Sequence, residues 1–132
     1  AGTCIFNDRM MIEDGFATQE NCAFGVYSSV VSRGGADRGI LDAGSKTLTS
    51  DTGGLQGFGL ILEHPDARIH KFAEEHGFLD LSECRNKPLV GDIVRVIPNH
   101  VCVAVNMVDQ LVAVRDGQII NVIPVEARGM LV

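Results

Sequence analysis

The sequence predicts a mainly β domain, folded as a barrel or a sandwich. Apolar and polar residues alternate with a period near two through most of the chain, as they do in half-buried strands. Fifteen glycines among 132 residues separate short strand-like runs, a spacing typical of barrels and sandwiches. Asp116-Gly117 lies between two β-rich runs. This pair favours a tight hairpin because both turn residues tolerate positive φ.

The individual elements follow from these signals in chain order. The polar residues 7–21 are expected to form a short helix or a linker. The runs after them are rich in β-branched residues and end at glycine or proline. Residues 67–81 fit a helix face or a strand pair turned at Gly77, and we expect the strand pair. The predicted strands lie within residues 22–33, 38–44, 57–65, 67–81, 91–100 and 110–127.

Length and charge exclude several classes of protein. A chain of 132 residues forms one domain and buries roughly two-thirds of its unfolded surface. Its net charge of −6 repels a phosphate backbone, so neither nucleic acid nor an acidic membrane surface is an expected partner. No apolar run approaches the roughly 20 residues that span a bilayer, and no signal-peptide pattern opens the chain. A cytoplasmic protein is therefore expected.

The cysteines and the first residues add two expectations. The four cysteines lie far apart and form no CxxC pair. Reduced thiols are expected rather than two disulfides, because no secretion signal is present. The chain begins at Ala1 without an initiator methionine, and its opening run AGTCIFNDRMM is typical of the interior of a protein. The chain could therefore be a processed or excised piece, or a natural short protein.

His100 and Cys102, within IPNHVCVAVN, are the strongest candidates for chemistry. In extended backbone, residues i and i+2 face the same side about 6.5–7 Å apart, so an imidazole nitrogen and a thiolate can reach one ion. This donor pair suits zinc. Two protein ligands leave coordination positions open, as in a catalytic site. The alternative is a buried cysteine beside a hydrogen-bonded histidine.

Two other regions hold weaker candidates. His76 follows Glu74 and Glu75, which could form a second metal or acid–base site, or simply a solvated acidic turn. Residues 41–54 are rich in glycine and hydroxyl groups and could cradle a phosphate, but they lack the P-loop spacing, and an ordered loop is the simpler interpretation. Lys46 in this loop has no apolar neighbours in sequence to lower its pKa, which disfavours a Schiff-base role.

Five segments in order resemble a known group of enzymes. They are AGTCIFNDRMM, LDAGSKTLTSD, EEHGFLDL, VGDIVRVIPNHVCVAVNMVDQL and IPVEARG. Together they resemble the C-terminal part of metal-activated pyridoxal enzymes, namely D-threonine aldolases and D-serine dehydratases, which share the alanine racemase-type fold (fold type III). PNHVC is the most specific of these matches.

The resemblance implies a domain division. Such enzymes have an N-terminal (β/α)₈ barrel, whose lysine holds pyridoxal phosphate, followed by a C-terminal β-domain. Residues 1–8 would then be the last barrel strand, residues 1–20 the end of the barrel with its linker, and residues 21–132 the β-domain. Gly2 and Thr3 match positions that offer backbone N–H groups to the cofactor phosphate. Cys4 departs from the tyrosine that often follows.

The resemblance also implies a reaction class. His100 and Cys102 would hold a divalent metal, zinc in preference to manganese, which acts as a Lewis acid on the β-hydroxyl of a D-amino acid, with pyridoxal 5'-phosphate as the electron sink. The products would be glycine and an aldehyde, or a keto acid and ammonia. The chain alone would be an inactive part of a homodimeric lyase and would dock on its own N-terminal barrel. The alternative is a non-catalytic β-barrel that serves as a binding or dimerisation module.

Overall fold

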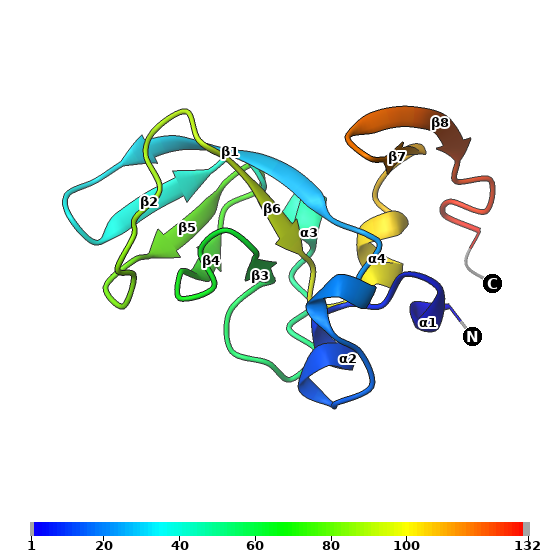
Figure 1. Cartoon of the computed structure of the whole chain (residues 1–132), viewed down its shortest axis with the longest axis horizontal. Coiled ribbons are helices and arrows are strands. Elements are labelled where there is room, and N and C mark those ends of the chain that lie inside the picture. The colour runs from blue at the N-terminus through cyan, green and yellow to red at the C-terminus, as the bar shows by residue number, and fades with distance from the viewer. Residues whose placement is uncertain (1, 131–132) are drawn as a thin grey trace.

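The computed structural model describes residues 2–130 and confirms a mainly β fold (Figure 1). A six-stranded sheet forms one part, and a separate β-hairpin near the C-terminus forms the other. Short helices lie between them. The helices are α1 (Thr3–Phe6), α2 (Arg9–Glu13), the 3₁₀ turn η1 (Gln19–Asn21), α3 (Ser45–Leu48) and α4 (Val101–Val105), and the strands are β1 (Val26–Arg33), β2 (Arg38–Leu41), β3 (Leu60–Ile61), β4 (Arg68–Phe72), β5 (Gly77–Asp80), β6 (Ile93–Ile97), β7 (Gln110–Arg115) and β8 (Gln118–Pro124).

The six-stranded sheet is nearly closed into a barrel. Its strand order is β3-β6-β1-β2-β5-β4, and every neighbouring pair is antiparallel. The two end strands approach each other, because the N–H of Phe58, just before β3, donates to the carbonyl of Ile69 in β4 at 2.9 Å. The rings of Phe58 and Phe72 pack there with centroids 4.4 Å apart. This closure protects strand edges that would otherwise be free to pair with another chain.

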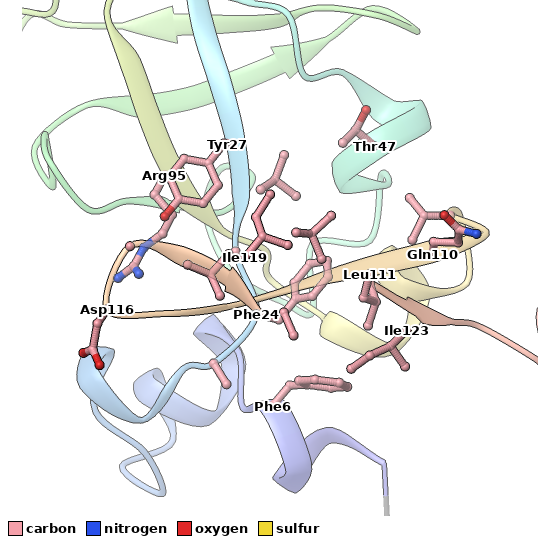
Figure 2. A pocket seen from close by; sticks show the side chains of 18 residues that line it. Phe6, Phe24, Tyr27, Thr47, Arg95, Gln110, Leu111, Asp116, Ile119 and Ile123 are labelled. Carbon is pink, nitrogen blue, oxygen red and sulfur yellow. The ribbon is translucent and has the colours of Figure 1, made fainter. Parts of the chain in front are cut away.

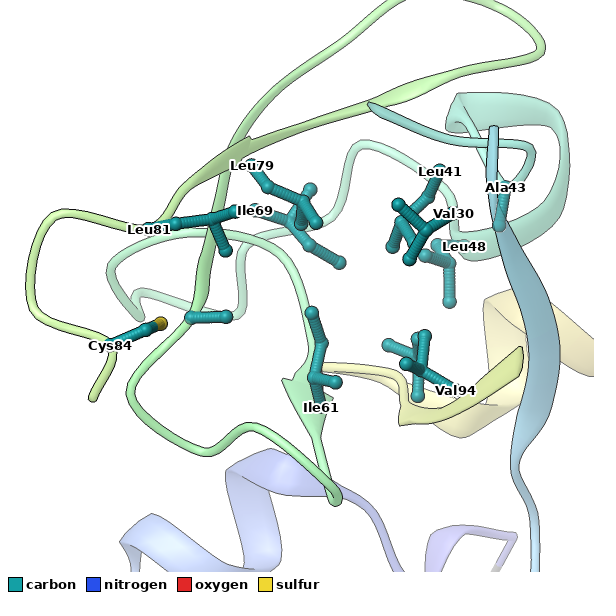
Figure 3. Close-up of a cluster of buried hydrophobic side chains, with 12 residues drawn as sticks. Val30, Leu41, Ala43, Leu48, Ile61, Ile69, Leu79, Leu81, Cys84 and Val94 are labelled. Atoms are coloured by element: carbon teal, nitrogen blue, oxygen red, sulfur yellow. The ribbon is translucent and has the colours of Figure 1, made fainter. Parts of the chain in front are cut away.

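Alternation along the strands supplies the barrel core. Leu79 in β5 and Val94 and Val96 in β6 are buried, whereas the residues between them are more exposed. The side chains of Leu79 and Val94 converge with the other core residues between the strands (Figure 3). Burial of this apolar surface is the main stabilising contribution to the fold. The core consists of Val30, Leu41, Ala43, Leu48, Ile61, Ala67, Ile69, Leu79, Leu81, Cys84, Val94 and Val96.

The C-terminal hairpin agrees with its sequence signal. Asp116 and Gly117 adopt φ values of 50° and 75°, as the two turn residues of a type I′ hairpin do. β7 and β8 pair only with each other among the described strands. Large apolar side chains therefore remain exposed on the hairpin, with Ile119 at 70% and Val112 at 57%.

Other strands also match the prediction. Residues 67–81 form the β4–β5 pair, and β5 begins at Gly77. The strand expected within residues 57–65 shortens to Leu60–Ile61, because Gly57 and Gly59 adopt φ values of 72° and 81°, which end the extended conformation. All four cysteines are free. No helix within residues 2–130 is long and apolar enough to cross a membrane.

The strand expected over residues 1–8 is not formed within residues 2–8, and Ala1 lies outside the described residues. Thr3–Phe6 is a single helical turn instead. Asp8 then begins α2, since its side chain accepts a hydrogen bond from the Met11 N–H. This capping carboxylate is a preferred start for a helix, so the segment turns where a strand would continue.

The Asp80 carboxylate makes the stability of the β4–β5 pair depend on pH. Hydrogen bonds from Ser82 and Arg68 lower the pKa of Asp80 to about 2. Because the pKa of Asp80 is lower in the folded state, the ionised carboxylate stabilises the fold at pH values above its unfolded pKa of about 3.9. This stabilisation is lost as the pH falls through the folded pKa. Asp80→Asn should therefore lower the free energy of unfolding near neutral pH, and its difference from wild type should shrink towards about pH 2.

Urea denaturation across this pH range measures the effect. Asp14→Asn is a matched control, because the exposed Asp14 carboxylate makes no ion pair or hydrogen bond with the described residues. A wild-type minus Asp80→Asn difference that stays constant with pH would contradict the prediction.

Candidate functional site

The candidate metal ligands lie in one turn between β6 and α4. β6 ends at Ile97, and His100 is the N-cap of α4 with φ −131° and ψ 109°. Cys102 lies in the first turn of the helix. The extended pair predicted from the sequence is therefore wrong: His100 is extended but Cys102 is helical. The two side chains therefore do not share one face of a strand.

Asn99 fixes the backbone of this turn. Its side chain is buried, with 2% exposure. Nδ2 donates to the carbonyls of Thr52 at 3.0 Å and Gly57 at 2.9 Å, with the Asp51 carbonyl at 3.4 Å. Oδ1 accepts from the Gly59 N–H at 2.8 Å. The loop 51–59 is thereby joined to the residue that immediately precedes His100.

The N-terminal segment holds the same turn from the other side. Asp8 is fully buried, and its Oδ2 accepts a hydrogen bond from the N–H of Val101 at 2.9 Å. That N–H begins α4 and has no partner within its own helix. The Arg9 N–H donates to the Pro98 carbonyl at 3.1 Å, and the Met10 N–H to the Asn99 carbonyl at 3.2 Å. Asp8 therefore explains why the β-branched run after His100 is helical.

His100 is paired with a carboxylate that the sequence did not single out. Its Nδ1 lies 2.9 Å from Oδ2 of Asp51. The hydrogen bond from His100, followed by that from the Gly53 N–H, lowers the pKa of Asp51. Asp51 lies within the predicted ordered loop 41–54, and its polar, glycine-rich neighbours gave no indication of a partner 49 positions away.

Cys102 lies against the two residues predicted to bind phosphate. Its Sγ is 3.3 Å from Oγ1 of Thr3, and a Cβ placed on Gly2 would lie 3.3 Å from the same sulfur. The thiol is free, and Cys102 is exposed, which contradicts the alternative of a buried cysteine. The structure thus brings Gly2 and Thr3 together with Cys102, which lies 99 positions after Thr3 in the chain.

The donor set fits an open divalent metal site. Nδ1 of His100 is hydrogen-bonded to Asp51, so Nε2 is the ring nitrogen available to bind a metal. Cys102 is exposed, so its sulfur is accessible. Imidazole nitrogen and thiolate are ordinary zinc ligands. No cluster of three or more His, Cys, Asp or Glu side chains suited to a metal occurs within residues 2–130.

The weaker candidates have structural partners. Lys46 makes ion pairs with Glu74 and Glu75 at 2.8 Å each, and their hydrogen bonds raise the pKa of Lys46. The lysine is therefore held in its charged form, which is not nucleophilic. His76, Glu74 and Glu75 do not form a metal-binding cluster, and no group of three or more such ligands occurs within residues 2–130. The acidic turn is a solvated ion-paired element.

A separate apolar groove lies beneath the β7–β8 hairpin (Figure 2). Its volume is about 860 Å³. Phe6 and Phe24 pack edge to face at its base, with ring centroids 6.2 Å apart, and Leu111 and Ile123 project towards them. The lining residues do not include His100, Cys102 or Asp51. This groove suits an apolar surface better than a charged amino acid.

Comparison with known proteins agrees with this architecture. The family model described as "Putative serine dehydratase domain" matches residues 23–114, and the chain belongs to this family. An uncharacterized protein of Mycobacterium tuberculosis is 39% identical over 95% of this chain and 98% of its own length. D-threonine aldolase of Arthrobacter sp is 35% identical over 88% of this chain but 29% of that enzyme. D-serine dehydratase of Dictyostelium discoideum is 30% identical over 91% of this chain and 34% of that enzyme.

Solved structures place the fold in the same group. D-threonine aldolase from Filomicrobium marinum superimposes with a TM-score of 0.81 at 26% identity, over 99% of this chain and 36% of that one. An alanine racemase-like protein from Idiomarina loihiensis gives 0.78 at 23% identity, over 89% and 35%. A cysteine-to-alanine variant of D-threo-3-hydroxyaspartate dehydratase in the metal-free form gives 0.78 at 21%, over 91% and 36%. The chain corresponds to the C-terminal part of pyridoxal enzymes of fold type III, as the sequence predicted.

Removal of the Asn99 side chain should destabilise the whole turn. Asn99→Ala leaves buried carbonyls and the Gly59 N–H without a partner, and each such group costs about 1–3 kcal/mol. We expect the free energy of unfolding, measured with urea, to fall by at least about 2 kcal/mol. Asn86→Ala is the matched control, because Asn86 is exposed and uses only its backbone carbonyl, as a partner of His64. Equal denaturation midpoints for the two variants would contradict the role of Asn99.

Proposed function

We propose that this chain is the metal-bearing C-terminal domain of a pyridoxal-phosphate-dependent lyase that acts on D-3-hydroxy amino acids. One observation supports this most strongly. His100 and Cys102, the predicted metal ligands, lie in one turn, and the Cys102 sulfur lies beside Gly2 and Thr3, the predicted phosphate-binding residues. The relatives include an aldolase and a dehydratase of D-amino acids, which supports a reaction of one of these two lyase types.

The metal half of the site is provided by this chain. His100 Nε2 and Cys102 Sγ would bind a divalent ion, with zinc preferred over manganese because of the thiolate. A structure in the same group is of a metal-free form of its protein, which supports a metal in such enzymes. When bound, the ion would supply Lewis acidity towards the substrate's β-hydroxyl, and pyridoxal phosphate an electron sink.

Gly2 and Thr3 would provide the phosphate contact. Gly2 lacks a side chain, so its backbone N–H can approach a ligand closely. Thr3 presents its backbone N–H from the start of α1, and its hydroxyl orients the Cys102 thiol at 3.3 Å. These contacts would place the cofactor phosphate and the metal ligand on adjoining surfaces of one site.

The lysine that holds the cofactor would come from outside this chain. Lys46 is paired with two glutamates, Lys87 with Asp37, and Lys71 lies over the ring of Phe78 at 5.6 Å. None of these partners belongs to the candidate site. We therefore propose that the domain is inactive alone and works with an N-terminal barrel in a cytoplasmic homodimer.

The second candidate function is a non-catalytic binding or dimerisation module. The exposed apolar hairpin and the groove beneath it favour this alternative, because exposed apolar patches of this kind commonly mark interaction surfaces. The apolar face is compatible with both candidates, since a lyase domain that docks on a barrel would also need such a face. They are distinguished by metal binding and by catalysis.

Metal binding should depend on the two predicted ligands. The chain is expected to bind Co²⁺ with a thiolate-to-cobalt charge-transfer band, because a cysteine sulfur is in the coordination sphere. His100→Ala should weaken binding strongly, and Cys102→Ser should abolish the band. Cys4→Ser is the matched control, since Cys4 is the other exposed free cysteine and should leave the band intact. Loss of the band in Cys4→Ser but not in Cys102→Ser would overturn the assignment.

The complete gene product tests the reaction. With pyridoxal phosphate and zinc it should convert D-threonine to glycine and acetaldehyde, or D-serine to a keto acid and ammonia, and EDTA should abolish this activity. The 132-residue chain alone should not turn over either substrate. Turnover by the chain alone at an enzyme-like rate, or neither product from the complete gene product, would contradict the proposed lyase.

A further inference from the structure

We infer that Asp51 is a positioning residue for His100, which holds the imidazole so that Nε2 can bind the metal. The inference rests on the proposed function, since it assigns a role toward the ion. His100 Nδ1 lies 2.9 Å from Asp51 Oδ2. An ionised carboxylate only accepts hydrogen bonds, so Nδ1 must carry the proton. In a neutral imidazole the lone pair is then on Nε2.

Asp51 is held in place independently of His100. Its Oδ1 accepts from the Gly53 N–H at 2.9 Å, and its own N–H donates to Thr49 Oγ1 at 3.3 Å. Asn99 Nδ2 approaches its carbonyl at 3.4 Å. The two carboxylate oxygens thus have separate partners, one within the loop and one on the imidazole.

Gly53 allows this loop to close. Its φ of 57° favours glycine, and a Cβ there would lie 2.3 Å from Met10 Sδ. Met10 belongs to α2, whose backbone also binds the Asn99 carbonyl. The carboxylate is therefore supported by the same packing that fixes the His100 turn. Oδ2 of Asp51 is free of other partners among residues 2–130, apart from the imidazole.

The chemical consequence concerns the ion. A metal-bound histidine whose second nitrogen donates to a carboxylate has a fixed tautomer and ring orientation and is a more basic ligand, and loss of such a partner typically costs about 10–100-fold in metal affinity. Asp51→Asn keeps the size of the side chain. Its amide can donate to Nδ1 instead, which favours the opposite tautomer, with the proton on Nε2 where the metal must bind.

Two measurements on the 132-residue chain test this role. Long-range ¹H–¹⁵N NMR of the metal-free wild type should show His100 with its proton on Nδ1. Competition titration with Zn²⁺ alone should show affinity reduced about 10–100-fold in Asp51→Asn. Asp66→Asn, which changes an exposed carboxylate in another loop, should match wild type in both measurements. Thermal melting checks that each variant is folded.

The outcomes separate this inference from the proposed function. A wild-type His100 with its proton on Nε2 overturns the role of Asp51 without the use of any variant. Tight Zn²⁺ binding that Asp51→Asn leaves unchanged overturns the role of Asp51 alone. If wild type, His100→Ala and Cys102→Ser all bind Zn²⁺ equally weakly, the metal site and the role of Asp51 both fail. The expected tautomer together with weakened binding in Asp51→Asn supports both.

Discussion

The side chain of Asn99 joins the loop 51–59 to the turn that follows β6. A buried side-chain amide that lacks hydrogen-bond partners destabilises the folded state. The Asn99 amide therefore needs its hydrogen bonds in the folded protein. Its carbonyl partners and the Gly59 N–H come from one loop, and Arg9 approaches its Oδ1 at 3.3 Å. The positions of His100 and Asp51 both follow from this arrangement, because each adjoins a backbone group that Asn99 holds.

Asp8 completes the constraint from the other end of the chain. Its carboxylate begins α2 through the Met11 N–H and begins α4 through the Val101 N–H. One buried side chain thus fixes the starts of two helices, although Asp8 and Val101 are 93 positions apart. The segment before α2 must then lie close to α4, which explains why Thr3 reaches Cys102. We propose that the metal and phosphate contacts are adjacent for this reason.

Local signals predicted the sheet and the hairpin, whereas the site depends on distant contacts. The turn at Asp116-Gly117 needs only two neighbouring residues that tolerate positive φ. The alternation of buried and more exposed residues in β5 and β6 is likewise visible within four or five residues of sequence. The run VCVAV is rich in β-branched residues, which favour strands, but a hydrogen bond to the Asp8 carboxylate starts a helix there. No local pattern connects Asp51 to His100. The sequence singled out the residues of the candidate metal site, but it did not predict their backbone conformation.

X-ray absorption at the zinc edge of the Zn²⁺-loaded chain tests the central claim, that the turn at His100 and Cys102 binds a metal. The account predicts one sulfur neighbour at about 2.3 Å together with nitrogen or oxygen neighbours at about 2.0–2.1 Å. In Cys102→Ser the sulfur neighbour should disappear. A wild-type spectrum with nitrogen and oxygen neighbours only, or a sulfur neighbour that persists in Cys102→Ser, would contradict the account.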